Sequence, residues 1–222
     1  MLSALTFAFK CKLCQHLAMT KPGYHHGDLA NALVAAALKM VEQDGEAALS
    51  LRDLAQSLGV SRAAPYRHFE DRDALLAAVA AKGFEELNVR YAAALETRGD
   101  GRAKLSAAQA AFFGFAYEKP GLYRLMFESD LLGRDRPPAV LIPPADESYR
   151  LLLRAVAGAH PDAGEAEVKR LTLIMMATGH GFLALDRAGR IKPFMLEPMT
   201  REDMIQALIG VVPSPAGEGF SP

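Results

Sequence analysis

Apolar residues recur with helical spacing from Asp28 onward, and no segment shows the strict apolar–polar alternation of a half-buried strand. The first amphipathic helix is expected to begin at Asp28, a good N-cap, and to end at Asp44-Gly45. Its apolar face consists of Leu29, Leu33, Ala36, Ala37, Met40 and Val41. The pattern therefore predicts an all-α protein.

Two short helices separated by a glycine turn are expected next. Ser50 can cap the first of them, and Gly59 can end it in a left-handed conformation. Ser61 can cap a third helix over residues 62–68. A short helix, a turn with glycine and a second short helix form the arrangement that lays a recognition helix in the major groove of DNA.

A longer helix is expected from Asp71-Arg72 to the break at residues 98–101, and large apolar side chains dominate beyond it. Further helices are expected over 102–118, 122–132, 145–158, 164–186 and 201–212, with a proline-rich loop over 133–144. The expected organisation is a disordered N-terminal extension (1–22), a three-helix DNA-binding head (23–72), a connecting helix (about 71–97), a larger helical domain (98–212) and a disordered tail (213–222).

Composition limits the classes of partner. Half of the 222 residues are apolar and 23% are charged, as in an ordinary folded globular protein. The net charge is −1, and residues 21–72 hold six Lys or Arg against seven Asp or Glu. DNA binding must therefore depend on where a few cations lie, not on a global basic field. No apolar run is long enough to span a bilayer, so a cytoplasmic protein without a membrane partner is expected.

Both cysteines lie near the N-terminus, at a CxxC spacing. Cys11 and Cys14 are followed by His16, His25 and His26, so a metal site is conceivable there. A closed zinc site usually brings two such pairs, and the segment has no strand–helix context for a redox motif. We therefore expect no metal or cofactor, and read the segment as an extension or as a misassigned start before Met19.

Residues around the second short helix can contact DNA. Arg62 can donate two hydrogen bonds to a guanine edge, and small side chains beside it keep the surface shallow enough for the backbone to approach the bases. Tyr66, Arg67 and His68 can reach phosphate oxygens on either side. The predicted DNA-contacting residues are Ser50, Arg52, Ser61, Arg62, Ala63, Ala64, Pro65, Tyr66, Arg67, His68 and Arg72.

The run LRDLAQSLGVSRAAPYRHF over residues 51–69, with Arg72 and Leu75-Leu76 after it, resembles the signature of TetR-type transcriptional regulators. Two positions depart from the family pattern. Ala64-Pro65 replaces the threonine–leucine often seen before the tyrosine, which affects base preference, and Arg72 replaces the usual lysine, which preserves a phosphate-binding charge.

This resemblance implies a homodimer whose recognition helices enter successive major grooves of a palindromic operator, about 34 Å apart. It also implies that a small molecule binds in the C-terminal domain, moves the connecting helix and shifts the heads to a spacing that no longer fits DNA. The expected function is a repressor released from double-stranded DNA by such an effector, although activation is the less common output of the family.

The C-terminal domain resembles that of one TetR subgroup, with a WHG-type ligand and dimerisation domain, through residues 117–127 and Gly179-His180-Gly181. Aromatic and methionine side chains at helical spacing are either core or the wall of a cavity, and they favour a hydrophobic or aromatic effector. The predicted pocket residues are Phe112, Phe113, Tyr123, Met126, Phe127, Tyr149, Met175, Met176 and His180.

The helix over 164–186 is apolar nearly all the way round between Leu171 and Leu185, so it must be covered on several sides. A second subunit could cover one side, with the last helix completing a four-helix interface. The predicted interface residues are Leu173, Ala177, Gly181, Ala184, Met204 and Leu208. The alternative is an internal helix of a monomer.

No group of residues in the sequence forms a catalytic set, because His25-His26 and His180 have no partner at catalytic spacing. We therefore predict no catalytic residues and no enzyme. The remaining alternative is a DNA-binding or adaptor protein that contacts DNA without sequence preference and without a ligand switch. Equal affinity for any duplex would favour that alternative.

Overall fold

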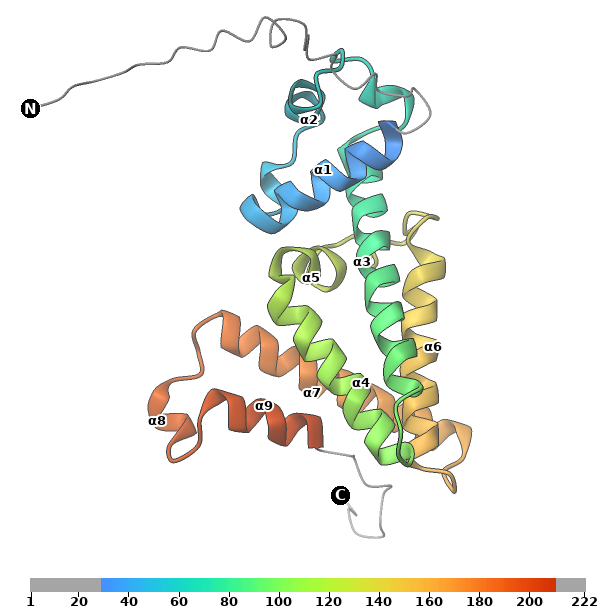
Figure 1. The fold of residues 1–222 in the computed structure, drawn as a ribbon, viewed down its shortest axis with the longest axis vertical. Coiled ribbons are helices and arrows are strands. Elements are labelled where there is room, and N and C mark those ends of the chain that lie inside the picture. The colour runs from blue at the N-terminus through green and yellow to red at the C-terminus, as the bar shows by residue number, and fades with distance from the viewer. Residues whose placement is uncertain (1–28, 211–222) are drawn as a thin grey trace, which may run out of the picture.

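The computed structural model describes residues 29–210, and within them all regular secondary structure is helical, which confirms the all-α prediction. The expected cap at Asp28, the terminal segments and the Cys11–His26 group lie outside the described residues. Figure 1 shows a small head at one end of an elongated molecule and a larger body at the other. No helix within 29–210 is long and apolar enough to cross a membrane.

The head consists of α1 (Leu29–Asp44), a 3₁₀ turn η1 (Glu46–Ala48), α2 (Leu51–Ser57) and a second 3₁₀ turn η2 (Pro65–Arg67). The apolar face of α1 is buried, with Leu33, Ala37 and Val41 fully inside. Leu54 on α2 is buried against the same small core. The amphipathic spacing of α1 thus sets the base on which the DNA-facing elements rest.

A single long helix, α3 (Arg72–Leu95), joins the head to the body. The Asp71 side chain caps it by accepting the N–H of Ala74 at 2.7 Å. Its first turns bury Leu75, Leu76 and Val79, and its last turns bury Tyr91 and Ala94 in the body. Any rotation of α3 in the body therefore reaches the head through a continuous helix.

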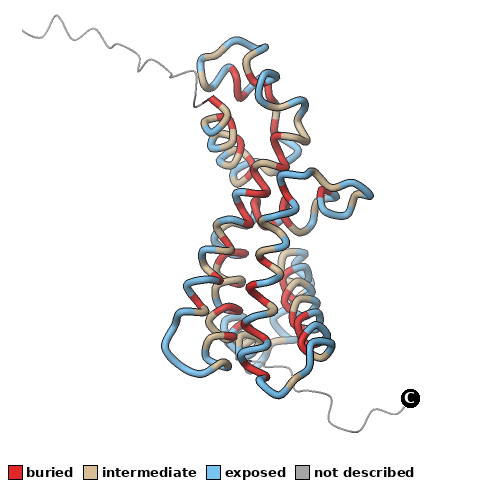
Figure 2. Tube along the Cα trace, turned by 90° about the vertical axis from the view of Figure 1, so that its right-hand side faces the viewer, coloured by how far each residue is buried: buried red, intermediate tan, exposed pale blue. Residues whose placement is uncertain are grey.

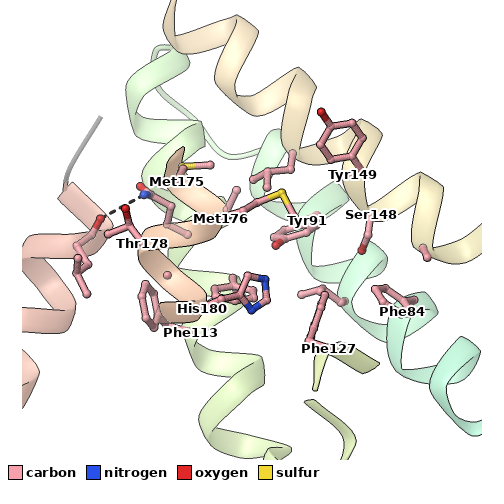
Figure 3. A pocket seen from close by; sticks show the side chains of 18 of the residues that line it. Phe84, Tyr91, Phe113, Phe127, Ser148, Tyr149, Met175, Met176, Thr178 and His180 are labelled. Carbon is pink, nitrogen blue, oxygen red and sulfur yellow. Dashed lines mark hydrogen bonds between the residues drawn. The ribbon is translucent and has the colours of Figure 1, made fainter. Parts of the chain in front are cut away.

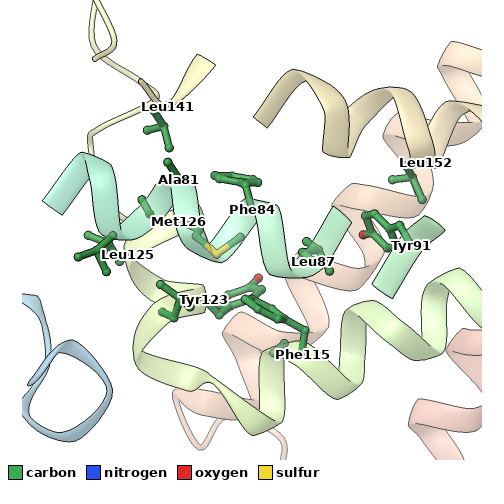
Figure 4. Close-up of a cluster of buried hydrophobic side chains, with 14 of the residues drawn as sticks. Ala81, Phe84, Leu87, Tyr91, Phe115, Tyr123, Leu125, Met126, Leu141 and Leu152 are labelled. Atoms are coloured by element: carbon green, nitrogen blue, oxygen red, sulfur yellow. The ribbon is translucent and has the colours of Figure 1, made fainter. Parts of the chain in front are cut away.

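The body contains α4 (Gly101–Glu118), α5 (Pro120–Phe127), α6 (Ile142–Ala159), α7 (Glu165–Arg187), α8 (Pro193–Leu196) and α9 (Arg201–Gly210). Helices α4 and α6 cross where Gly101 meets Gly158, and a Cβ at Gly101 would lie within 1.7 Å of the Gly158 carbonyl oxygen. Figure 2 shows the buried positions forming a stripe that continues from head to body. Figure 4 shows its central part, where α3 packs on α5 through Phe84, Tyr123 and Met126.

Three element boundaries differ from the sequence prediction. The helix expected over 122–132 begins at Pro120 and ends at Phe127. The end of the expected 133–144 loop belongs to α6, because Pro143 and Pro144 occupy its first turn, where a missing N–H costs nothing. The short helix α8 was not expected. In each case a proline lies in the first turn of the helix.

Candidate DNA-binding surface and internal cavity

The DNA-facing part of the head is built around α2 and the turn after it. Ser50 caps α2 by accepting the N–H of Asp53 at 3.4 Å, and its side chain is half-buried. Gly59 has φ 68°, in the left-handed region that glycine adopts without strain, and it turns the chain out of α2. Val60 then returns to the core, so the chain between them is held at both ends.

The residues that follow this turn present their side chains to solvent. Tyr66 is 58% exposed, and Arg62, Arg67 and His68 are also exposed. Arg52, Ser61 and Ala63 lie on the same exposed part of the head. Within residues 29–210, Arg52, Arg62 and Arg67 form no salt bridge, so their guanidinium groups are available to an anionic partner.

The segment expected to be a continuous helix over 62–68 is shorter in the structure. Residues 62–64 form a turn and η2 covers only Pro65–Arg67. Pro65 has no N–H to donate to the Ser61 carbonyl, which instead accepts the N–H of Ala64 at 2.9 Å. The i→i+3 bond replaces the α-helical one, and the recognition element is a tight helical turn.

Three of the predicted DNA-contacting residues, Ala64, Pro65 and Arg72, make contacts within the head. Pro65 is buried against the head core and Ala64 is half-buried, so the shallow exposed surface consists of Ala63 alone. Arg72 donates from Nε to the Leu49 carbonyl at 3.1 Å and from a terminal nitrogen to the Glu46 carbonyl. Two of its N–H groups therefore fasten α3 to the η1 turn, while the side chain remains 40% exposed.

Head and body meet where α1 ends against the start of α5. The half-buried Glu42 carboxylate accepts the backbone N–H groups of Gly121 (3.3 Å) and Leu122 (2.5 Å), which are unpaired at the helix N-terminus. A Cβ on Gly121 would lie 2.3 Å from the Val41 carbonyl oxygen, so only glycine permits this approach. A residue of the DNA-binding head thus caps a helix of the body.

The body contains a partly open cavity of about 460 Å³ between α3, α4, α5, α6, α7 and α9. Its wall is mostly aromatic and aliphatic, and Figure 3 shows Phe113, Phe127, Tyr91 and His180 around the space. The lining side chains are Phe84, Leu87, Tyr91, Ala108, Gln109, Phe112, Phe113, Phe127, Leu132, Ala145, Ser148, Tyr149, Leu152, Ile174, Met175, Met176, Thr178, His180 and Leu208, with Gly179.

His180 is the titratable imidazole of this wall. The Tyr123 hydroxyl lies 2.5 Å from its Nδ1, and the rings of Phe112 and Phe127 lie 5.0 and 4.8 Å away. Burial, together with the positive charge of Arg187, lowers the pKa of His180 to about 4, so the ring is neutral at neutral pH. Burial also raises the pKa of Tyr123, so the phenol keeps its proton.

All predicted pocket residues except Tyr123 and Met126 line the cavity. Tyr123 contacts His180 from outside the cavity, and Met126 packs against Gly83 of α3. The prediction missed the α3 wall formed by Phe84, Leu87 and Tyr91, and the contribution of Ser148 from α6. The helical spacing of the α3 residues was visible in the sequence, but it is equally the spacing of core.

The exposed side of α7 carries apolar and small residues: Leu173, Ile174, Ala177, Gly181, Ala184 and Leu185. Leu173 is 57% exposed and Leu185 is 47% exposed in the single chain, whereas Phe182 and Leu183 are buried. The opposite face of α7 packs inside the body, so within residues 29–210 the helix is covered on one side only. Met204 and Leu208 of α9 are half-buried against the core of their own chain, and Leu208 also lines the cavity.

A helix-turn-helix head joined by one long helix to a helical body with a cavity is an architecture typical of DNA-binding transcription regulators. Residues 33–79 match the family model of bacterial regulatory proteins, tetR family, and residues 105–212 match that of a tetracyclin repressor-like C-terminal domain. The chain belongs to the TetR family, as the sequence signature predicted. Within residues 29–210, no group of His, Cys, Asp and Glu could hold a metal ion.

Three relatives show how far the likeness extends. A solved protein of unknown function from Rhodococcus sp. RHA1 is 33% identical, with a TM-score of 0.69 over 85% of this chain and 93% of that one. The transcriptional activator FasR of Mycolicibacterium smegmatis is 35% identical over 98 residues, 44% of this chain and 45% of FasR. The nucleoid occlusion factor SlmA of Escherichia coli is 33% identical over 102 residues, 43% of this chain and 52% of SlmA. The chain thus matches about half the length of these two curated relatives.

Proposed function

We propose that the protein is a ligand-controlled repressor that binds a palindromic operator as a homodimer and releases it when a small apolar effector enters the body. The observation that carries the proposal is the course of α3. One end of this helix supports the DNA-facing turn, and the other end, through Phe84, Leu87 and Tyr91, forms a wall of the cavity. A ligand that displaces this wall changes the direction of the head.

The head supplies the DNA contacts of the proposal. Arg62 reads a base edge from the turn after α2, while Arg67, Tyr66 and His68 hold phosphates beside it. Because few cations take part, non-specific affinity is modest and discrimination depends on Arg62. Such a protein acts where the chromosome is, so we place it in the cytoplasm.

The dimer in this proposal forms through the exposed face of α7. An apolar stripe containing Leu173 and Leu185 is costly to leave in water, and Ala177, Gly181 and Ala184 let a second α7 approach closely. Light scattering should give the mass of a dimer, and Leu173→Asp should give a monomer. Phe194→Asp, at an exposed residue of α8, is the matched control and should leave the dimer intact.

The direct experiment selects bound sequences from random duplex DNA and repeats the selection with apolar candidate ligands. We expect one palindromic sequence to be enriched and to be lost when an effector is present. A reporter gene placed downstream of the selected sequence then distinguishes repression from activation. FasR is named as an activator.

The similarity to SlmA favours a second candidate, a DNA-binding or adaptor protein without a ligand switch. The cavity counts against it, because a purely structural core would fill this space with side chains. Equal affinity for any duplex, with a steep dependence on salt, would support this second candidate over the first.

A further inference from the structure

The cavity offers no charged group to a ligand. None of the described residues that line it is Lys, Arg, Asp or Glu. An ion transferred from water into such a wall would lose its hydration without a partner, at a cost that exceeds what apolar contact returns. The part of the occupant that lies inside the cavity is therefore uncharged, and its polar atoms must match the few polar atoms of the wall.

One of these polar atoms has a defined role. The Tyr123 side chain is 1% exposed, and within residues 29–210 its hydroxyl has no hydrogen-bond acceptor other than Nδ1 of His180. The phenol therefore donates to Nδ1, and the neutral imidazole must carry its proton on Nε2. Arg187 holds Tyr123 in place, because its guanidinium lies 3.9 Å from the centre of the Tyr123 ring and donates to Glu128 and to the Ala116 carbonyl.

We propose that the cavity binds an uncharged aromatic ligand with a carbonyl-type oxygen, and that Nε2–H of His180 donates a hydrogen bond to this oxygen. Tyr123 is a positioning residue, which fixes the tautomer of His180 without touching the ligand. Tyr91 lines the same cavity from α3, and its hydroxyl bonds to no other described residue, so it supplies a second donor to the same oxygen. This inference rests on the proposed function, because it names the chemistry of the proposed effector.

The two donors come from different parts of the switch. His180 belongs to α7, the helix that also carries the exposed apolar face, and Tyr91 belongs to α3, which ends in the DNA-binding head. An oxygen held between them ties α3 to α7 through the ligand. A hydrocarbon of the same shape fills the space but makes no such connection.

The test uses three probes of nearly equal shape: benzophenone, diphenylmethane and diphenylacetate. Calorimetry on the full chain without DNA should show benzophenone binding about tenfold more tightly than diphenylmethane, because a buried N–H finds an acceptor only in the ketone. Diphenylacetate should bind most weakly. Equal affinity for the ketone and the hydrocarbon, preference for the carboxylate, or no binding of any probe would each overturn the inference.

Two variants distinguish the role of His180 as hydrogen-bond donor from the role of Tyr123 as positioning residue. His180→Phe should remove the preference for benzophenone over diphenylmethane while leaving diphenylmethane binding intact. Tyr123→Phe should reduce the same preference and shift the ¹⁵N resonances of His180 away from those of a pure Nε2–H tautomer. A merely structural loss would instead weaken both probes equally. Tyr117→Phe, which removes a partly exposed hydroxyl on α4 outside the cavity, is the matched control and should keep the preference.

The failure of this inference and of the proposed function are distinguishable. Ketone preference without any effect of benzophenone on operator binding supports the ligand chemistry and refutes ligand-controlled release. Release of DNA by diphenylmethane as readily as by benzophenone, at equal occupancy, supports the switch and refutes the coupling through the carbonyl oxygen.

Discussion

The head and the body are both helical, but the head places its candidate site on the surface and the body places its candidate site between helices. In the head, a small core holds polar side chains outward, and the proposed DNA contacts Arg62, Arg67 and His68 lie within a single turn region. In the body, six helices, the first and last of them more than a hundred residues apart, turn apolar side chains inward around a cavity. The head's site is local in sequence and the body's site is not.

This difference determines where each site is vulnerable. A site made of exposed residues loses binding when one of them changes, but the fold beneath it stays intact. A site made by packing cannot be altered without affecting stability, because its residues are also core. The contact between Glu42 and the start of α5 is where the two kinds of site depend on each other.

The largest effect is expected at the contact between head and body. Gly121→Ala places a Cβ 2.3 Å from the Val41 carbonyl oxygen and 2.8 Å from Cα of Glu42, neither of which is a side chain that could rotate away. The free energy of unfolding should fall by about 3 kcal/mol, although alanine favours a helix. Urea unfolding measures it. Gly164→Ala, where nothing lies within 4 Å, is the control, and equal stability of the two variants would contradict the packing argument.

Arg62→Ala tests the local character of the head. Loss of a bidentate contact to a base should weaken operator binding by about 2 kcal/mol, or roughly thirtyfold, and relax sequence preference at one position in each half-site. A gel-shift series over single-base operator variants measures both. Arg124→Ala removes the same charge from an exposed position of the body and should change neither. Unchanged preference in the Arg62 variant would remove Arg62 from the base contacts.

The body should show a dependence on pH that the head lacks. His180 has a pKa near 4 in the fold against about 6.5 when unfolded, so the unfolded chain binds more protons between these values. The stabilisation is complete above pH 6.5 and is lost as the pH falls towards 4. Between pH 6.5 and pH 5 the wild type should lose about 1.5 kcal/mol more than His180→Phe. Parallel losses in urea titrations at the two pH values would contradict a neutral, buried His180.

The smallest effect is expected for Glu42→Gln, which keeps the shape of the cap but weakens its two charge-assisted hydrogen bonds. Stability should fall by about 1 kcal/mol. Asp44→Asn makes the same charge change two residues later on α1, without a contact to α5, and serves as the control. Effector binding by Glu42→Gln should be normal, while the effector should release less DNA. Full release would show that α3 alone transmits the change.

The local character of the head explains how much of it the sequence predicted. Periodicity located α1, α2 and α3, and the exposed positions of Arg62, Arg67 and His68 follow from a pattern of under ten residues. The recognition turn was wrong in length because Pro65, four residues after Ser61, removes the N–H that would begin an α-helix. The position of Pro65 was visible in the sequence, but the helical periodicity of the neighbouring residues was given more weight.

The body was less predictable because facing direction is set by packing between distant helices. Tyr123 and Phe127 lie four residues apart on one face of α5, so both were assigned to the pocket, yet only Phe127 reaches the cavity while Tyr123 supports His180. Phe84, Leu87 and Tyr91 have the spacing of ordinary core. Whether these α3 residues face the cavity or the core depends on how α6 and α7 pack against α3. No local pattern in the α3 sequence encodes that packing.

The α3 residues that line the cavity also constrain which substitutions this protein can accept during evolution. A substitution at Phe84 or Leu87 that admits a larger ligand also alters the helix that aims the head, so a new effector would be gained together with a misplaced DNA-binding surface. Changes at Tyr149 on α6 or Met176 on α7 alter the same space without touching that helix. Among descendants of this chain, effector preference should therefore diversify through α6 and α7, while the α3 wall stays nearly fixed.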